Sequence, residues 1–156
     1  IIGKILHYLA GFFGGYFYYH LIAVDRKYTF VVRFLGILYA YLLLGLSLQW
    51  IFTPVLAAAD FGFVLNELSN DAQNALLRDF TSFFVATFLF SLLGAITLNP
   101  IWFLSAGIVY FGAGIFNLMA IYVHGTDFNQ IFIFEFILSA WPSALAITIF
   151  LKERNN

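Results

Sequence analysis

Four long, almost uncharged stretches dominate this sequence and restrict what the chain can fold into. They cover residues 5–24, 34–59, 80–126 and 131–151, and Glu135 is the only Asp, Glu, Lys or Arg within them. Apolar residues make up 63% of the chain and charged residues 10%, against about 45–50% and about 25% in soluble domains. A soluble domain of this length exposes too much surface to hide that many apolar side chains. We therefore expect lipid to surround most of the chain.

The lengths of these stretches predict how many times the chain crosses the bilayer. A helix crosses the hydrocarbon core in about 20 residues, so the stretch 80–126 must turn back, and Asn99-Pro100 is the expected turn. Runs such as Leu42-Leu43-Leu44 lack the alternation of a membrane barrel. The sequence predicts an all-α, polytopic transmembrane helical bundle that forms one integral membrane domain over residues 1–156. The expected helices are at about 5–24, 34–57, 72–98, 101–123 and 131–151, with four crossings if the first helix lies at the interface.

Basic residues gather at one predicted face of the membrane. Five of the seven Lys and Arg fall in the segment 25–33 or at the C-terminus, whereas the segments 60–79 and 124–130 are mostly acidic. By the positive-inside rule, we expect the C-terminus in the cytoplasm and the N-terminus outside. The chain begins with Ile1-Ile2, so we expect a processed or missing start and treat the stretch 5–24 as a retained helix.

Two further local signals concern helix geometry. Asn70 or Asp71 is placed to cap the helix expected from about residue 72. Pro142, which follows Trp141 in the last stretch, marks an expected kink.

From about residue 34 onward, the chain resembles the small bacterial four-helix membrane proteins of domain-of-unknown-function family 4345. The matching features are Pro54, Gly62, the segment 74–80, Gly112, Gly114, Gly125 and Glu135. Where that family tends to carry an arginine in its next-to-last helix, this chain has Asn117. The resemblance implies a four-helix membrane fold in a bacterial inner membrane, to which the stretch 5–24 is an addition. It implies no established activity.

One group of polar residues is expected to meet near the outer face. An ionisable side chain at membrane depth is costly unless it is paired or faces water, and Glu135 lies about one turn inside the last predicted helix. Its expected neighbours are Arg78, Asp79, Asn117 and His124. We predict a polar cluster or ligand site, with Arg78 as the first candidate partner of Glu135 and a binding or proton-handling role as the alternative.

Histidine is the usual axial ligand of haem, so the three histidines leave a haem or chlorophyll site open. The residues are His7, His20 and His124. His7 and His20 fall on opposite faces of one predicted helix, and we favour interfacial histidines bonded to water or headgroups. No cofactor is predicted. The chain has no cysteine, and we predict no metal site.

Glycines in the predicted helices indicate close helix packing. Small residues four positions apart let helix backbones approach, and the expected packing positions are Gly11, Gly15, Gly36, Gly107, Gly112 and Gly114. The contact is expected either inside the bundle or against a partner.

The sequence contains no recognisable enzyme motif, so we predict no catalytic residues. A net charge of −1 without a basic stripe predicts no nucleic-acid partner. The favoured function is an accessory or scaffold subunit of a larger membrane complex, in contact with lipid and with other integral membrane subunits. Two alternatives remain: a small-molecule or proton-linked transporter or binding protein that uses the outer polar pocket, and a subunit that contacts pigment, haem or quinone.

Overall fold

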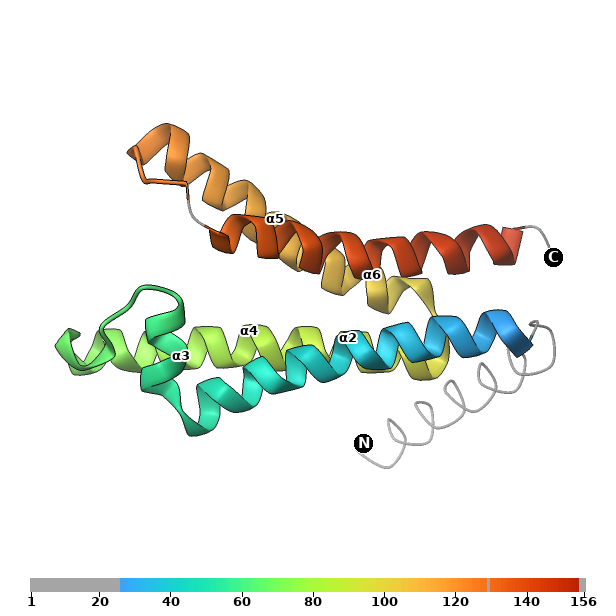
Figure 1. Cartoon of the computed structure of the whole chain (residues 1–156), viewed down its shortest axis with the longest axis horizontal. Coiled ribbons are helices and arrows are strands. Elements are labelled where there is room, and N and C mark those ends of the chain that lie inside the picture. Colours follow the sequence, from blue (N-terminus) through green and yellow to red (C-terminus); the bar gives the residue numbers. More distant parts are fainter. Residues whose placement is uncertain (1–25, 129, 155–156) are drawn as a thin grey trace, which may run out of the picture.

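The computed structural model of the chain describes residues 26–128 and 130–154, and all of its regular elements are helices (Figure 1). The elements are α2 (Arg26–Phe52), α3 (Pro54–Asp60), the 3-10 turn η1 (Leu65–Glu67), α4 (Asn70–Thr97), α5 (Pro100–His124) and α6 (Gln130–Arg154). No strand occurs in these two ranges. The helix predicted at 5–24, with Gly11, Gly15, His7 and His20, lies outside the described residues.

Four of the described helices, namely α2, α4, α5 and α6, are long and apolar enough to cross a membrane. Their outward faces carry large apolar side chains, such as Phe52 at 75% exposure and Phe116 at 69%. Contiguous apolar surface on this scale is not stable in water. The all-helical prediction is therefore confirmed for the described residues, and the apolar faces of these four helices indicate a lipid environment.

The clearest differences from the predicted helix boundaries are in α2 and α4. The helix expected from residue 34 begins at Arg26 and stops at Phe52, because Pro54 lacks the N–H that would continue it and instead starts α3 at its first turn. The cap of α4 is Ser69, whose hydroxyl accepts a hydrogen bond from the Ala72 N–H at 3.3 Å. Asn70 and Asp71, the expected caps, lie inside the helix.

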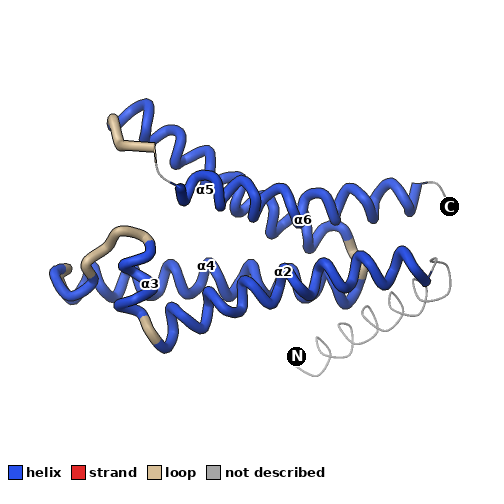
Figure 2. The backbone as a smooth tube through the Cα atoms, viewed as in Figure 1, coloured by secondary structure: helices blue, strands red, loops and turns tan. Residues whose placement is uncertain are grey.

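The four long helices form two pairs (Figure 2). Helix α2 packs along α4, and α5 packs along α6. The pairs meet near the turn between α4 and α5, where Leu98 adopts a left-handed conformation and the Asn99 side chain accepts a hydrogen bond from the Ile101 N–H. Toward α3 and the connection between α5 and α6, the pairs diverge (Figure 1).

The pairs are joined by a phenylalanine that fits against two glycines. Phe103 of α5 is fully buried and lies over Gly36 of α2 and Gly94 of α4. A Cβ atom added to Gly36 would come within 2.6 Å of the Phe103 ring, and one added to Gly94 within 2.9 Å. The absence of a side chain at both glycines therefore provides the space that the Phe103 ring occupies.

The remaining predicted packing glycines separate into two groups. Gly107 contacts Ser143 of α6, and Gly114 approaches Phe136. A Cβ added to Gly112 would meet nothing within 4 Å. Close packing inside the bundle therefore involves Gly36, Gly107 and Gly114, whereas Gly112 takes no part in it within the described residues.

Helix α6 continues through Pro142. A hydrogen bond joins it to α2 at the backbone carbonyl whose usual donor the proline removes. A proline at position 142 cannot donate to the carbonyl of residue 138. The Tyr39 hydroxyl of α2 donates to that Leu138 oxygen at 2.6 Å, and its ring lies 5.7 Å from the Trp141 ring. A side chain from another helix thus satisfies a carbonyl that neither lipid nor α6 itself can satisfy.

Replacing Gly94 with alanine is expected to destabilise the fold, because its methyl group would overlap the buried Phe103 ring. Overpacking of this kind costs about 1–3 kcal/mol. Gly112→Ala is the matched control. It should leave the stability unchanged, since its methyl group meets open space. Thermal unfolding in detergent measures both, and equal midpoints for the two variants would contradict the described packing.

Tyr39→Phe should lower the free energy of unfolding by about 1 kcal/mol, because it leaves the Leu138 carbonyl unpaired. Pro142→Ala supplies an N–H that can bond to the same carbonyl. In that background the loss of the Tyr39 hydroxyl should cost less than it does in the wild type. A double-mutant cycle measured by unfolding in detergent tests this coupling, and strict additivity would exclude it.

Candidate functional site

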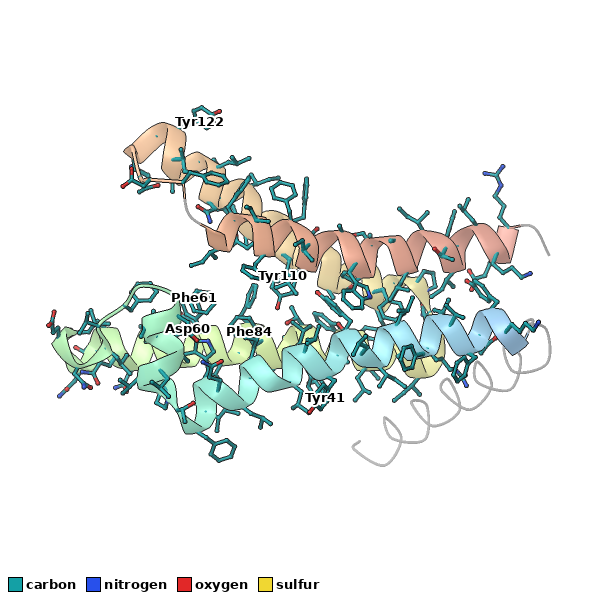
Figure 3. The ribbon with its side chains drawn as sticks, in the orientation of Figure 1. Tyr41, Asp60, Phe61, Phe84, Tyr110 and Tyr122 are labelled. Atoms are coloured by element: carbon teal, nitrogen blue, oxygen red, sulfur yellow. The ribbon has the colours of Figure 1, made fainter. Side chains whose placement is uncertain are left out.

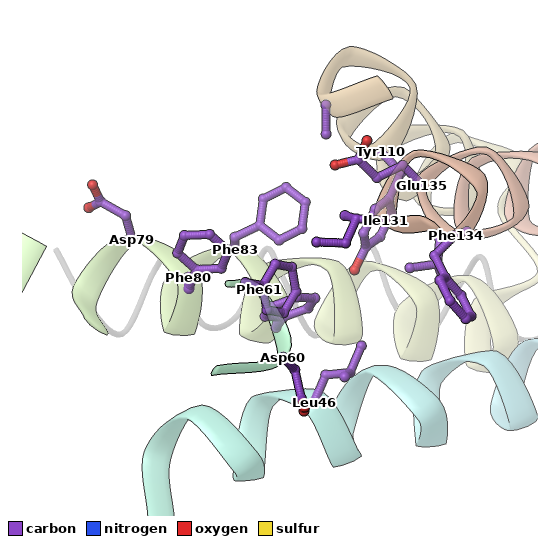
Figure 4. Close-up of a pocket in the computed structure, with 13 residues that line it drawn as sticks. Leu46, Asp60, Phe61, Asp79, Phe80, Phe83, Tyr110, Ile131, Phe134 and Glu135 are labelled. Atoms are coloured by element: carbon purple, nitrogen blue, oxygen red, sulfur yellow. The ribbon is translucent and has the colours of Figure 1, made fainter. Parts of the chain in front are cut away.

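A cavity of about 660 Å³ opens where the two helix pairs diverge (Figures 3 and 4). All four long helices and the end of α3 contribute to its wall. The lining residues are Leu46, Asp60, Phe61, Asp79, Phe80, Phe83, Phe84, Tyr110, Ala113, Ile131, Phe134, Glu135 and Leu138. This volume falls within the range of about 300–1,000 Å³ that is typical of small-molecule sites.

Aromatic rings form one wall of the cavity and support one another. The Phe80 ring is stacked against Trp50, with centroids 4.5 Å apart, and meets the Phe61 ring edge-on at 5.1 Å. Phe83 meets Tyr110 of the opposite pair edge-on at 5.0 Å. Such pairs stabilise their geometry beyond simple burial, so the aromatic wall is preformed.

Three polar side chains that line the cavity, Glu135, Asp60 and Tyr110, are each close to an uncharged polar side chain. The Asn117 amide donates to the Glu135 carboxylate at 3.2 Å, across from α5 to α6. The Gln49 amide donates to the Asp60 carboxylate at 2.7 Å. The Tyr110 hydroxyl, buried at 2% exposure, lies 3.2 Å from the Thr87 hydroxyl. Each group is therefore oriented by a second side chain.

The predicted polar cluster is brought together only in part. Glu135 and Asn117 are bonded to each other, and Asp79 lines the same cavity as Glu135. Arg78 instead pairs with its neighbour Asp79 at 2.7 Å, on side chains that are 71% and 64% exposed. His124 is the exposed last residue of α5. The partner of Glu135 is thus Asn117 and not Arg78, because Arg78 lies on an exposed face of α4.

Sequence reasoning missed Asp60, Tyr110 and the aromatic wall. Asp60 directly follows an apolar stretch, so the sequence suggests only that it marks the end of a membrane segment. Nothing in the sequence indicates that α3 turns its side chain toward α2. Tyr110 and the phenylalanines are spread through apolar runs whose faces the sequence does not distinguish. Residue types alone therefore indicated Asp79 and Glu135, but neither Asp60 nor the side chains that enclose the cavity.

The chemistry available in this cavity is that of binding. Its wall is mostly apolar, and its polar groups accept hydrogen bonds at a few separate points, which is how small-molecule sites orient a ligand. In the described ranges no three His, Asp or Glu side chains gather in a way that could hold a metal ion. A haem or pigment contact through His124 stays a prediction, since its exposed place at the end of α5 is equally suited to water.

The link between Asn117 and Glu135 can be measured by a double-mutant cycle. Asn117→Leu should lower the free energy of unfolding by about 1–3 kcal/mol, because it leaves a half-buried carboxylate without its donor. Combined with Glu135→Leu, the loss should be smaller than the sum of the two single losses. The same cycle between Arg78→Ala and Glu135→Leu should be additive, and coupling to Arg78 in place of Asn117 would contradict the geometry.

Comparisons with known proteins do not assign the chain to a family. No family model matches it, and no curated protein or solved structure is similar to it. The resemblance to domain-of-unknown-function family 4345 therefore stays a prediction, and the cavity and its lining carry the functional argument.

Proposed function

We propose that this chain is a membrane-embedded binding protein for a small molecule that has a long apolar part and one polar end. The cavity between the two helix pairs is the observation that carries the proposal. This proposal develops the sequence-based alternative of a small-molecule binding protein with an outer polar pocket. In the structure, aromatic side chains line that pocket and Arg78 does not.

The cavity lies at a depth that suits such a ligand. Glu135 is five residues after the start of α6, which at 1.5 Å per residue is about 8 Å along the helix. An apolar molecule could therefore lie along the aromatic wall while its polar end stays near Glu135, close to the membrane surface. A bilayer is also the natural source of such molecules, because they partition into it.

We further propose that the cavity lies toward the outer side of a bacterial inner membrane. Lys27, Lys152 and Arg154 lie at the end where α2 begins and α6 ends (Figure 1). Asp60 and Asp127 lie toward the opposite end, where the pairs diverge. Under the positive-inside rule the basic end is cytoplasmic, which places the cavity at the other face.

Filling the cavity should abolish binding. Ala113→Phe places a ring in the space that the ligand would occupy, whereas Ala144→Phe adds the same ring to an exposed face of α6. We expect native mass spectrometry of the wild type, extracted from its own membranes in mild detergent, to detect one bound small molecule per chain. Ala144→Phe should retain it and Ala113→Phe should lose it. A wild type without a bound molecule, or equal retention by both variants, would refute the proposal.

An accessory-subunit role remains a second proposal, and one observation favours it. Gly45 and Gly112 have no atom of the described chain near the position of an added Cβ, although glycine weakens a helix relative to alanine. A neighbouring protein could approach closely at either position. The same mass measurement would reveal a stoichiometric protein partner.

A further inference from the structure

The charge of the cavity lining restricts the polar end of the ligand. Its ionisable side chains, apart from the Tyr110 phenol, are the carboxylates of Asp60, Asp79 and Glu135, and none of its thirteen residues is Lys, Arg or His. Arg78 neutralises Asp79 through the ion pair on the exposed face of α4. Asp60 and Glu135 remain as the two acidic groups whose charge is not neutralised in this way.

The partners of these two carboxylates satisfy hydrogen bonds but carry no charge. Gln49 and Asn117 are neutral amides, and neither carboxylate makes an ion pair in the part of the chain that the structure describes. A carboxylate at membrane depth is stabilised when a cation lies beside it. A second carboxylate or a phosphate in the same cavity would instead be repelled.

The aromatic wall favours the same kind of ligand. The face of an aromatic ring attracts a cation, and aromatic side chains combined with carboxylates are the usual surroundings of quaternary ammonium groups. Phe61, Phe80 and Phe83 lie around the space that Glu135 faces from the other helix pair (Figure 4). The carboxylates and the aromatic rings thus both favour a ligand with a positively charged group. The apolar remainder of the wall favours a hydrocarbon chain on the same ligand.

We infer that the ligand is a cationic amphiphile, an amine or quaternary ammonium group on an alkyl or similar apolar chain, with its charge held beside Glu135. Asp60, which is exposed and bonded to Gln49 on the opposite side of the cavity (Figure 4), adds negative charge there. This inference rests on the proposed binding function and specifies its ligand class. Fatty acids and anionic lipids are excluded by the same charges.

Three probes of equal chain length test the inference: dodecyltrimethylammonium, dodecanol and dodecanoate. Binding of each to the purified full chain, in one uncharged detergent, is followed by native mass spectrometry and by the shift in unfolding midpoint. We expect the wild type to bind dodecyltrimethylammonium about tenfold more tightly than dodecanol, and dodecanoate more weakly than either.

Variants assign that preference to the cavity. Glu135→Gln should reduce the preference for the cation to about threefold or less, and Asp60→Asn should reduce it by a smaller factor. Glu67→Gln removes a carboxylate outside the cavity and should keep the wild-type preference. A cooperative unfolding transition of the ligand-free variant, measured in the same detergent, shows that it is folded, and if one of the two cavity variants fails to fold, the other decides.

The outcomes separate this inference from the proposed function. If all three probes bind equally and Ala113→Phe abolishes their binding, the cavity is a binding site and the cationic preference is wrong. Tighter binding of dodecanoate, or a preference for the cation that survives in both cavity variants, overturns the inference in the same way. If no probe binds, or Ala113→Phe has no effect on binding, the binding function itself fails.

Discussion

The contact of Phe103 with Gly36 and Gly94 determines how the two helix pairs are placed. Glycine at position 36 of α2 and at position 94 of α4 leaves room for the whole Phe103 ring against both backbones. Helix α5 therefore approaches α2 and α4 at the same level. In lipid, where burying apolar surface provides little net drive between helices, close packing of this kind is a main source of association. The pairs are consequently held together at one end and free to diverge at the other.

A second constraint is that lipid offers no hydrogen bonds, so each backbone and hydroxyl group needs a partner within the protein. Most buried hydroxyls solve this locally: Ser47 donates to the Leu43 carbonyl at 2.8 Å and Ser91 to the Thr87 carbonyl at 2.7 Å. Other hydroxyls reach another helix. Ser139 donates to the Gly107 carbonyl of α5 at 3.0 Å, and Tyr39 donates to the Leu138 carbonyl that Pro142 leaves without its usual donor. The Tyr39 bond links α2 to α6 at the boundary between the packed and the divergent halves of the bundle.

The cavity follows from these two constraints. Beyond the level of Tyr39 and Thr87, the pairs separate, and aromatic side chains line the space between them. The acidic groups that reach it come from segments close to the membrane surface, where a carboxylate costs less than at the bilayer centre. An apolar wall with accessible carboxylates is thus a result of where the helices diverge and not of any single motif.

Much of the fold could be predicted from the sequence because a bilayer imposes a simple length rule. The long uncharged stretches predict the helices α2, α4, α5 and α6, and Asn99-Pro100 predicts the turn between α4 and α5. The distribution of basic residues predicts their orientation in the membrane. None of these features depends on how the helices pack. Boundaries were less accurate. The segment 26–33 joined α2 despite its charges, because charged side chains can extend toward the membrane surface from a continuing helix.

The sequence alone therefore determined that the chain forms helices long and apolar enough to cross a membrane, and it singled out Glu135 as the acidic residue that needs a partner. Only the tertiary structure decided that this partner is Asn117, that Arg78 faces away, and that Asp60 and the aromatic residues share a cavity with Glu135. The physical reason is that crossing a membrane depends on the hydrophobicity of each segment by itself. Which helix faces meet depends on the rotation of each helix about its axis, and in helices that are apolar on all sides the order of residues does not specify that rotation.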